Sequence, residues 1–232
     1  MIPTRERRSF WVALVALCTI GVAISIRRLG ALAGPIPMNN PGLDALDAVF
    51  AAKRTLTASH VLVGLLLALA IPIQFSARIR NRYRRVHRWL GRFLLLVGLL
   101  VGVSAYGMMV RPVGGWLERS ATGFYDTAFL VALAAAWWHI RHRDVTRHRE
   151  WMLRASGIAL GIATTRPIMA VFFATSPLTA LKPSEFFGVA MWIGFTSTVL
   201  AAELYIRSTR VTTPVQSSPA LTGSPAGISF GA

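Results

Sequence analysis

The chain has 232 residues, of which 54% are hydrophobic and only 15% are charged, and its formal net charge is +16. Soluble domains carry roughly 25% charged residues, so this composition excludes an ordinary water-soluble domain. In a soluble protein such a positive charge would indicate nucleic-acid binding. Here the basic residues lie beside the ends of apolar segments, so we expect no nucleic-acid partner.

Six apolar segments account for most of the chain. They cover about residues 10–26, 56–75, 89–110, 121–140, 152–174 and 186–206. At about 17–25 residues each, they match the length that crosses a ~30 Å hydrocarbon core. The sequence therefore predicts an all-α fold, a polytopic bundle of six transmembrane helices within residues 10–207. We expect the second to fifth spans to form a four-helix core that the first and sixth spans flank.

The first span follows a short basic segment, residues 1–9, which we expect in the cytoplasm. Its apolar run is longer than that of a usual signal peptide, and arginines rather than small residues follow it, which predicts an uncleaved anchor. Further along, Leu43, Leu46 and Phe50 recur at helical spacing. This pattern predicts a short helix at the outer interface, and a plain loop is an equally good interpretation.

Arginines are concentrated at alternate turns between the spans. Twelve surround the two turns after spans two and four, and Arg207 and Arg210 follow span six; the twelve are Arg78, Arg80, Arg82, Arg84, Arg85, Arg88, Arg92, Arg141, Arg143, Arg147, Arg149 and Arg154. The positive-inside rule predicts that these regions and both termini are cytoplasmic. Anionic lipid headgroups are the expected partners of these arginine patches. Arg27 and Arg28, between the first two spans, are the local exception.

The segment after the last span and the glycines of the third and fifth spans carry further signals. Residues 208–232 are rich in Ser, Thr, Pro and Gly, which predicts a disordered cytoplasmic tail. Gly98 and Gly102 form a GxxxG motif in span three, and Gly157 and Gly161 form another in span five. In lipid, such spacing lets two helices approach closely.

Three polar residues lie well inside the predicted spans, namely His60, Asp126 and Arg166. Counted along the helices, all three fall in the outer half of the membrane, so we predict a polar cluster there. An arginine at such depth costs at least ~2.5 kcal/mol, and it must face the bundle or a wet cavity. One interpretation is an Arg–Asp pair that sets helix register. The other is a site for an anionic group or a quinone-like head, which would suit a small-solute or lipid transporter.

His87 and His148 begin the third and fifth spans and could face each other across the inner side of the bundle. A single b-type haem would take such a pair as axial ligands, and Arg88 and Arg149 could hold its propionates. The simpler interpretation is that these residues are interfacial anchors. No catalytic residue and no metal site is predicted.

The segments around these histidines, His87–Arg92 and His148–Arg154, each begin with a His-Arg pair, and Arg166 follows. With this pattern the chain resembles a bacterial membrane-protein family known as domain of unknown function 2306, from about His60 to Glu203. The resemblance implies a multi-pass protein of the bacterial inner membrane and no established reaction.

The hairpins also resemble those of haem-b cytochromes of the b561 and ferric-reductase kind. Those proteins have histidines stacked along one helix or matched on both sides of the bilayer. This chain instead has one inner histidine at the start of the third span and one at the start of the fifth. We therefore expect an integral inner-membrane protein of undetermined, non-catalytic function. The alternatives are a membrane oxidoreductase with one haem b and a small-solute or lipid transporter.

Overall fold

The computed structural model describes residues 4–34 and 41–210 of the chain. These residues form eight helices and no strand, in the order α1 (Thr4–Ala33), α2 (Pro41–Ala51), α3 (Arg54–Phe75), α4 (Ala77–Arg82), α5 (Arg84–Met108), α6 (Gly115–Arg141), α7 (Val145–Thr179) and α8 (Pro183–Thr209). The all-α prediction is therefore confirmed. Most of the predicted tail, from residue 211 onward, lies outside the described residues.

Five helices are long and apolar enough to cross a membrane: α1 over Arg8–Ala33, α3, α5, α7 and α8. α6 matches them in length, with 27 residues, but it is not among these candidate spans, and the charged residues Glu118, Arg119 and Asp126 lie along its first half. The described part of the chain is therefore that of a membrane protein with several apolar helices.

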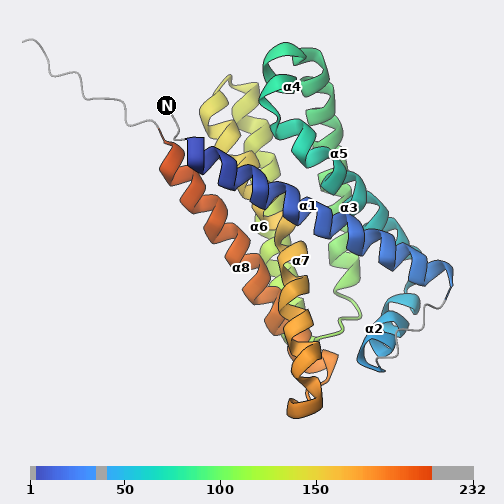
Figure 1. Ribbon diagram of the computed structural model, residues 1–232. Helices are drawn as coiled ribbons and strands as arrows, with labels where there is room; N and C mark the ends of the chain where they lie inside the picture. Colours follow the sequence, from blue (N-terminus) through green and yellow to red (C-terminus); the bar gives the residue numbers. More distant parts are fainter. Residues whose placement is uncertain (1–3, 35–40, 211–232) are drawn as a thin grey trace, which may run out of the picture.

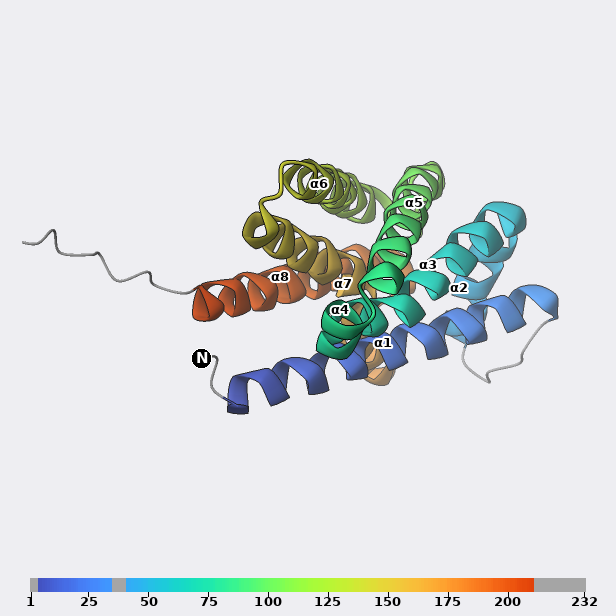
Figure 2. The same ribbon diagram turned by 90° about the horizontal axis from the view of Figure 1, so that it is seen from above.

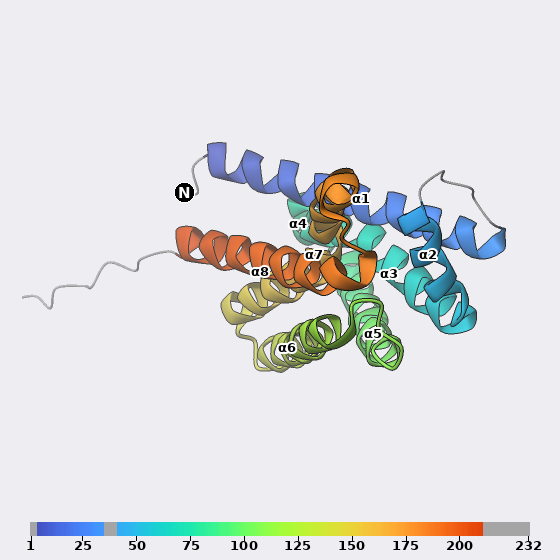
Figure 3. The same ribbon diagram turned by 90° about the horizontal axis from the view of Figure 1, so that it is seen from below.

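The arginine-rich turns gather at one end of the bundle. α4 and the α6–α7 turn lie at this end, together with the start of α1 and the end of α8 (Figure 1). α2 lies at the opposite end. We call these the inner and the outer end. α1 does not run parallel to the other long helices but crosses one side of the bundle obliquely (Figures 2 and 3), where it packs against α3 and α7.

The packing of the helices differs from the expected four-helix core. α7 packs most extensively against α8 and then against α6, while α3 packs against α5 and α1. The first and last long helices thus contribute buried residues to the same core as the others, among them Leu14 and Cys18 from α1 and Met191 from α8. A core of four helices with two flanking ones is therefore not confirmed.

Glycines bring neighbouring helices into close contact, as the GxxxG spacing predicted. A Cβ atom on Gly161 of α7 would lie 2.6 Å from Cδ1 of Phe195 on α8, and one on Gly98 of α5 would lie 2.8 Å from Cδ1 of Leu133 on α6. Real Cβ atoms do not approach so closely, so a side chain at Gly98 would force Leu133 to shift, and one at Gly161 would also crowd the Phe195 backbone at 3.0 Å. The motif on α5 therefore faces α6, and the motif on α7 faces α8.

The outer connection contains a helix rather than a plain loop. α2 spans Pro41–Ala51 and buries Leu46 and Phe50 against the bundle, as the apolar spacing predicted. Its end is fixed by the hydroxyl of Thr57, which donates to the carbonyl of Phe50 at 3.0 Å. Lys53 donates to the carbonyls of Met108 and Arg111 at 3.1 and 2.8 Å. α2 therefore forms part of the outer end of the bundle.

Candidate functional site

A cavity of about 220 Å³ lies among the long helices. Its wall is mostly apolar and includes residues of every helix except α4. The ionisable residues on the wall are Arg28, His60, Glu118, Asp126 and Arg166. The three residues of the predicted outer polar cluster thus line one cavity. Their arrangement around it, however, differs from a compact cluster.

His60 is held at the α3–α5 contact. Its Nδ1 lies 2.8 Å from Oγ of Ser104, and that hydroxyl donates to the carbonyls of Leu100 and Val101 at 2.7 and 2.9 Å. Because the single hydroxyl proton is used in this way, the oxygen accepts from His60, which places a proton on Nδ1. The other ring nitrogen, Nε2, is then the acceptor that His60 can offer to the cavity.

Asp126 lies on α6 with only 8% of its surface exposed. One carboxyl oxygen, Oδ2, is buried and has no hydrogen-bond partner. The other lies against α5, where a Cβ atom on Gly102 would be 3.3 Å away. Gly102 of the GxxxG motif therefore provides the space for this carboxyl. No basic group of the described residues forms an ion pair with it.

Arg166 lies on α7 directly before Pro167, and the helix continues through the proline. Its Nε is buried without a partner, and its Nη1 has only the sulfur of Met169, at 3.6 Å. Within the described ranges no carboxylate lies within ion-pair distance of it, so the structure does not support the predicted Arg–Asp register pair. The charged groups close enough to act on Arg166 are Arg28 and Arg27, which repel it.

Arg28 was not predicted as a site residue, yet it is the second arginine on the cavity wall. It is 5% exposed, its guanidinium lies 4.1 Å above the ring of Phe50, and it donates to Oδ1 of Asp47 on α2. Arg27 donates to both oxygens of the same carboxylate, at 3.1 and 2.8 Å. The signal in the sequence was the breach of the positive-inside rule by Arg27 and Arg28.

The charges at the outer end of the cavity do not balance. Three guanidinium groups, those of Arg27, Arg28 and Arg166, lie close enough to repel one another, and Asp47 is the one carboxylate that pairs with any of them in the described residues. Glu118 is engaged elsewhere: it accepts from the backbone N–H of Gly114 at 2.6 Å and acts on Lys53. The guanidiniums at the outer end are therefore not fully paired, although the carboxyl groups of Glu118 and Asp126 lie on the same cavity wall.

The inner histidines lie near each other, close enough for their charges to interact. Nδ1 of His148 lies 2.9 Å from the carbonyl of Ala136, so it carries a proton, while Nδ1 of His87 is buried without a partner. The cavity described beside Gln74, whose Nε2 donates to the carbonyl of His87, measures about 20 Å³. That volume holds about one water molecule, and neither His87 nor His148 is among the residues that line it.

The arginines predicted beside these histidines have different surroundings. Arg149 donates to Oγ1 of Thr209 at 3.1 Å and lies over the ring of Tyr205, so it joins α7 to the end of α8. Arg88 is exposed. Nearby, Arg154 binds Glu203 through hydrogen bonds of 3.0 and 3.2 Å. In residues 4–34 and 41–210, no group of three or more His, Cys, Asp or Glu side chains could hold a metal ion.

Several long apolar helices, with polar residues and a cavity among them, are those of a helical membrane protein. Residues 57–206 match the family described as "Predicted membrane protein (DUF2306)", so the chain belongs to that family. The resemblance expected from the His-Arg segments and Arg166 is thereby confirmed. No curated protein and no solved structure matches the chain.

Proposed function

We propose that this protein binds, in the cavity, a small molecule with an apolar body and an anionic head. One observation carries the proposal: Arg28 and Arg166 line the same apolar cavity, and in the described residues Asp47 is the one carboxylate that forms an ion pair with Arg27, Arg28 or Arg166. A bound anion would give Arg166 the ion-pair partner that it lacks.

Charge and solvation both favour such a ligand. An arginine inside the membrane costs at least about 2.5 kcal/mol, and Arg166 has no carboxylate in the described chain to reduce this cost. Hydrogen bonds between a guanidinium and an anionic oxygen are roughly twice as strong as neutral ones. Binding of an anion would therefore relieve an energetic cost that the ligand-free protein carries.

The size and lining of the cavity limit the rest of the molecule. At about 220 Å³ it is smaller than the ~300–1,000 Å³ of pockets for drug-sized ligands. Apolar side chains such as Phe129, Met191 and Phe195 make up most of its wall. A short alkyl or single-ring body suits this space, and Nε2 of His60 offers an acceptor for a hydroxyl on it.

The binding test compares three probes of equal chain length: hexanesulfonate, hexanol and hexyltrimethylammonium. Purified protein in detergent should unfold about 5 °C higher at a hexanesulfonate concentration of about 100 times Kd, with smaller shifts for the other two. Arg166→Gln should remove the preference for hexanesulfonate. Arg141→Gln, which removes one exposed inner arginine, is the matched control and should keep it. Equal shifts with the anion and the cation would refute the proposal.

We further propose that the chain crosses a bacterial inner membrane six times with both termini in the cytoplasm. Two observations support this: the arginine-rich turns gather at one end, and the start of α1 and the end of α8 lie at that same end (Figure 1). The positive-inside rule then makes this the cytoplasmic end, where anionic headgroups meet the arginines. With α6 as a sixth span, all of the arginine-rich turns fall on one side.

A membrane oxidoreductase with one inner haem b is the second candidate. His87 and His148 lie near each other, and the bond from His148 Nδ1 to a carbonyl is how metal-binding histidines are usually held. Neither histidine, however, lines the cavity beside Gln74 or the large cavity, so a porphyrin between them would require the inner ends of the helices to move apart. The anion site needs no such movement, and we favour it for that reason.

A further inference from the structure

The inner cavity beside Gln74 and the large cavity share a wall. The small cavity is lined by residues at the inner ends of their helices, including Gln74, Leu94, Met152 and Ser156. Four residues line both cavities, and these are Leu67, Ile71, Phe129 and Ala159. Because the same side chains contact both spaces, a single layer of residues separates them. We call these four residues the shared wall.

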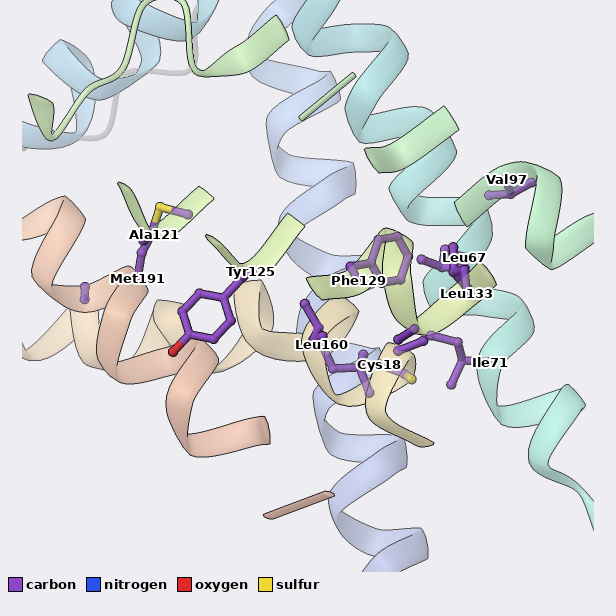
Figure 4. Close-up of a cluster of buried hydrophobic side chains, with 14 of the residues drawn as sticks. Cys18, Leu67, Ile71, Val97, Ala121, Tyr125, Phe129, Leu133, Leu160 and Met191 are labelled. Carbon is purple, nitrogen blue, oxygen red and sulfur yellow. The ribbon is translucent and has the colours of Figure 1, made fainter. Parts of the chain in front are cut away.

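The shared wall is apolar and comes from three helices. Leu67 and Ile71 project from α3 and Phe129 from α6, and Figure 4 shows these three side chains close together in the core. All three are buried, with exposures of 9%, 4% and 4%. Ala159 of α7 completes the layer. Phe129 is the largest member, so its ring contributes most to the barrier.

Polar groups lie on both sides of this barrier. On the inner side, Gln74 donates to the carbonyl of His87 at 3.2 Å, while its Oε1 is buried without a partner. Gly91 makes room for this amide, since a Cβ atom there would lie 2.9 Å from Gln74 Nε2. On the outer side lie His60, Asp126 and the arginines. Buried polar atoms without partners are rare in proteins, and here they mark both sides of one apolar layer.

We propose that the two cavities are halves of one passage through the bundle, closed by the shared wall, and that the protein moves a small amphipathic anion along it. The anion enters the outer cavity at Arg28 and Arg166, and movement of the wall side chains opens the way toward Gln74 and the basic inner end. This inference rests on the anion site proposed above and adds transport to binding.

Single-cysteine labelling tests the passage without knowledge of the natural ligand. The natural Cys18 is first replaced by Cys18→Ala. Thr122→Cys then reports on the outer cavity and Ser156→Cys on the inner one. Vesicles with α2 facing the medium are treated with the anionic sulfonatoethyl methanethiosulfonate. We expect labelling at position 122 but none at 156, and adding Phe129→Ala should change position 156 from unreactive to fully labelled.

A matched substitution distinguishes opening of the shared wall from a general loosening of the helix packing. Phe186 is 2% exposed and lines neither cavity, so Phe186→Ala removes the same atoms from the same kind of environment and should leave position 156 unlabelled. Phe129→Leu, a milder change, covers the case in which Phe129→Ala does not fold. The passage is refuted if position 156 stays unreactive in folded Phe129 variants, or if Phe186→Ala exposes it equally.

Two further measurements separate this inference from the anion site. At position 122 the anionic reagent should react about tenfold or more faster than the cationic trimethylammonium reagent, because clefts of one charge concentrate opposite ions. Arg166→Gln should abolish this difference; a failure here refutes the anion site. Proteoliposomes should take up hexanesulfonate faster than protein-free liposomes. Binding without uptake would leave the anion site standing and overturn transport.

Discussion

Arg27 on α1 holds Asp47 on α2 through two hydrogen bonds, Nη1 to Oδ1 at 3.1 Å and Nη2 to Oδ2 at 2.8 Å. Arg28 donates to the same carboxylate and lies over the ring of Phe50. Bidentate pairs of this kind are directional as well as strong. The pair therefore fixes α2 at the outer end of the cavity and also keeps Arg28 on the cavity wall.

Replacement of this carboxylate should loosen the outer end of the bundle. We expect Asp47→Asn to lower the free energy of unfolding by about 2 kcal/mol, since hydrogen bonds to charged groups contribute roughly 1.5–3 kcal/mol. Thermal unfolding in detergent measures the loss. Asp44→Asn is the matched control on the same helix, because Asp44 is exposed. An equal loss from both variants would argue against a role for the pair.

The same ion pair predicts a dependence on pH. Burial alone raises the pKa of the Asp47 carboxyl, but the hydrogen bond from Arg27 and the charges of Arg28 and Arg27 outweigh it and hold the pKa below its usual range. A carboxyl of this kind contributes stability above its unfolded pKa of ~3.9 and loses it as the pH falls through the folded pKa. The stability difference between wild type and Asp47→Asn should therefore be full at neutral pH, shrink as the pH falls below about 4, and vanish only below the lowered folded pKa.

The sequence brought three residues to one cavity correctly, but it could not predict in which direction each side chain leaves its helix. Counting residues placed His60, Asp126 and Arg166 at similar depth, and all three line one cavity. An Asp126–Arg166 pair was one of two interpretations of the sequence, and it is not among the ion pairs of the described residues, because partners also depend on the rotation of α6 and α7. Helix packing sets that rotation through contacts such as Gly102 against Asp126, which no spacing reveals.

Ion pairs between segments that are distant in the chain could also not be predicted from the sequence. Asp47 is separated from Arg28 by 19 residues and by an uncharged turn, so charge counting recorded Arg27 and Arg28 only as an exception to the positive-inside rule. Their pairing explains the exception: Arg28 is buried and Arg27 half-buried, and both bind the carboxylate of Asp47 at the contact between α1 and α2. Gln74 gave no signal, because a single glutamine near a helix end is common on protein surfaces.

Gly161 should be essential to the contact between α7 and α8. Its added Cβ atom would lie 2.6 Å from Phe195 Cδ1 and 3.0 Å from Phe195 Cα, and the backbone atom cannot move aside cheaply. We expect Gly161→Ala to destabilise the protein by about 1–3 kcal/mol, the usual cost of overpacking. Gly64 has nothing within 4 Å of its added Cβ, so Gly64→Ala should be neutral or raise stability by up to about 1 kcal/mol. Denaturant titration of both variants in detergent compares them.

An absorption spectrum decides between the anion site and the haem candidate. Because neither His87 nor His148 lines the large cavity or the one beside Gln74, we expect protein purified after haem-replete expression to show no Soret band. If a band is seen, His87→Ala and His148→Ala should each abolish it, and that result would contradict our expectation and establish the pair as ligands. Arg88→Ala, which changes an exposed neighbour, controls for unspecific effects on haem uptake.

The position of α6 determines the number of spans. It is the one long helix whose composition does not mark it as a membrane span in the described chain, yet it connects the outer loop before Gly115 to the arginine-rich turn after Arg141. If α6 spans, alkaline phosphatase fused after residue 114 or 181 should be active, and the enzyme fused after residue 143 or 210 should be inactive, because it folds only outside the cytoplasm. Equal activity after residues 114 and 143 would show that α6 does not cross. The arginines of the α6–α7 turn would then lie on the outer side, against the positive-inside rule.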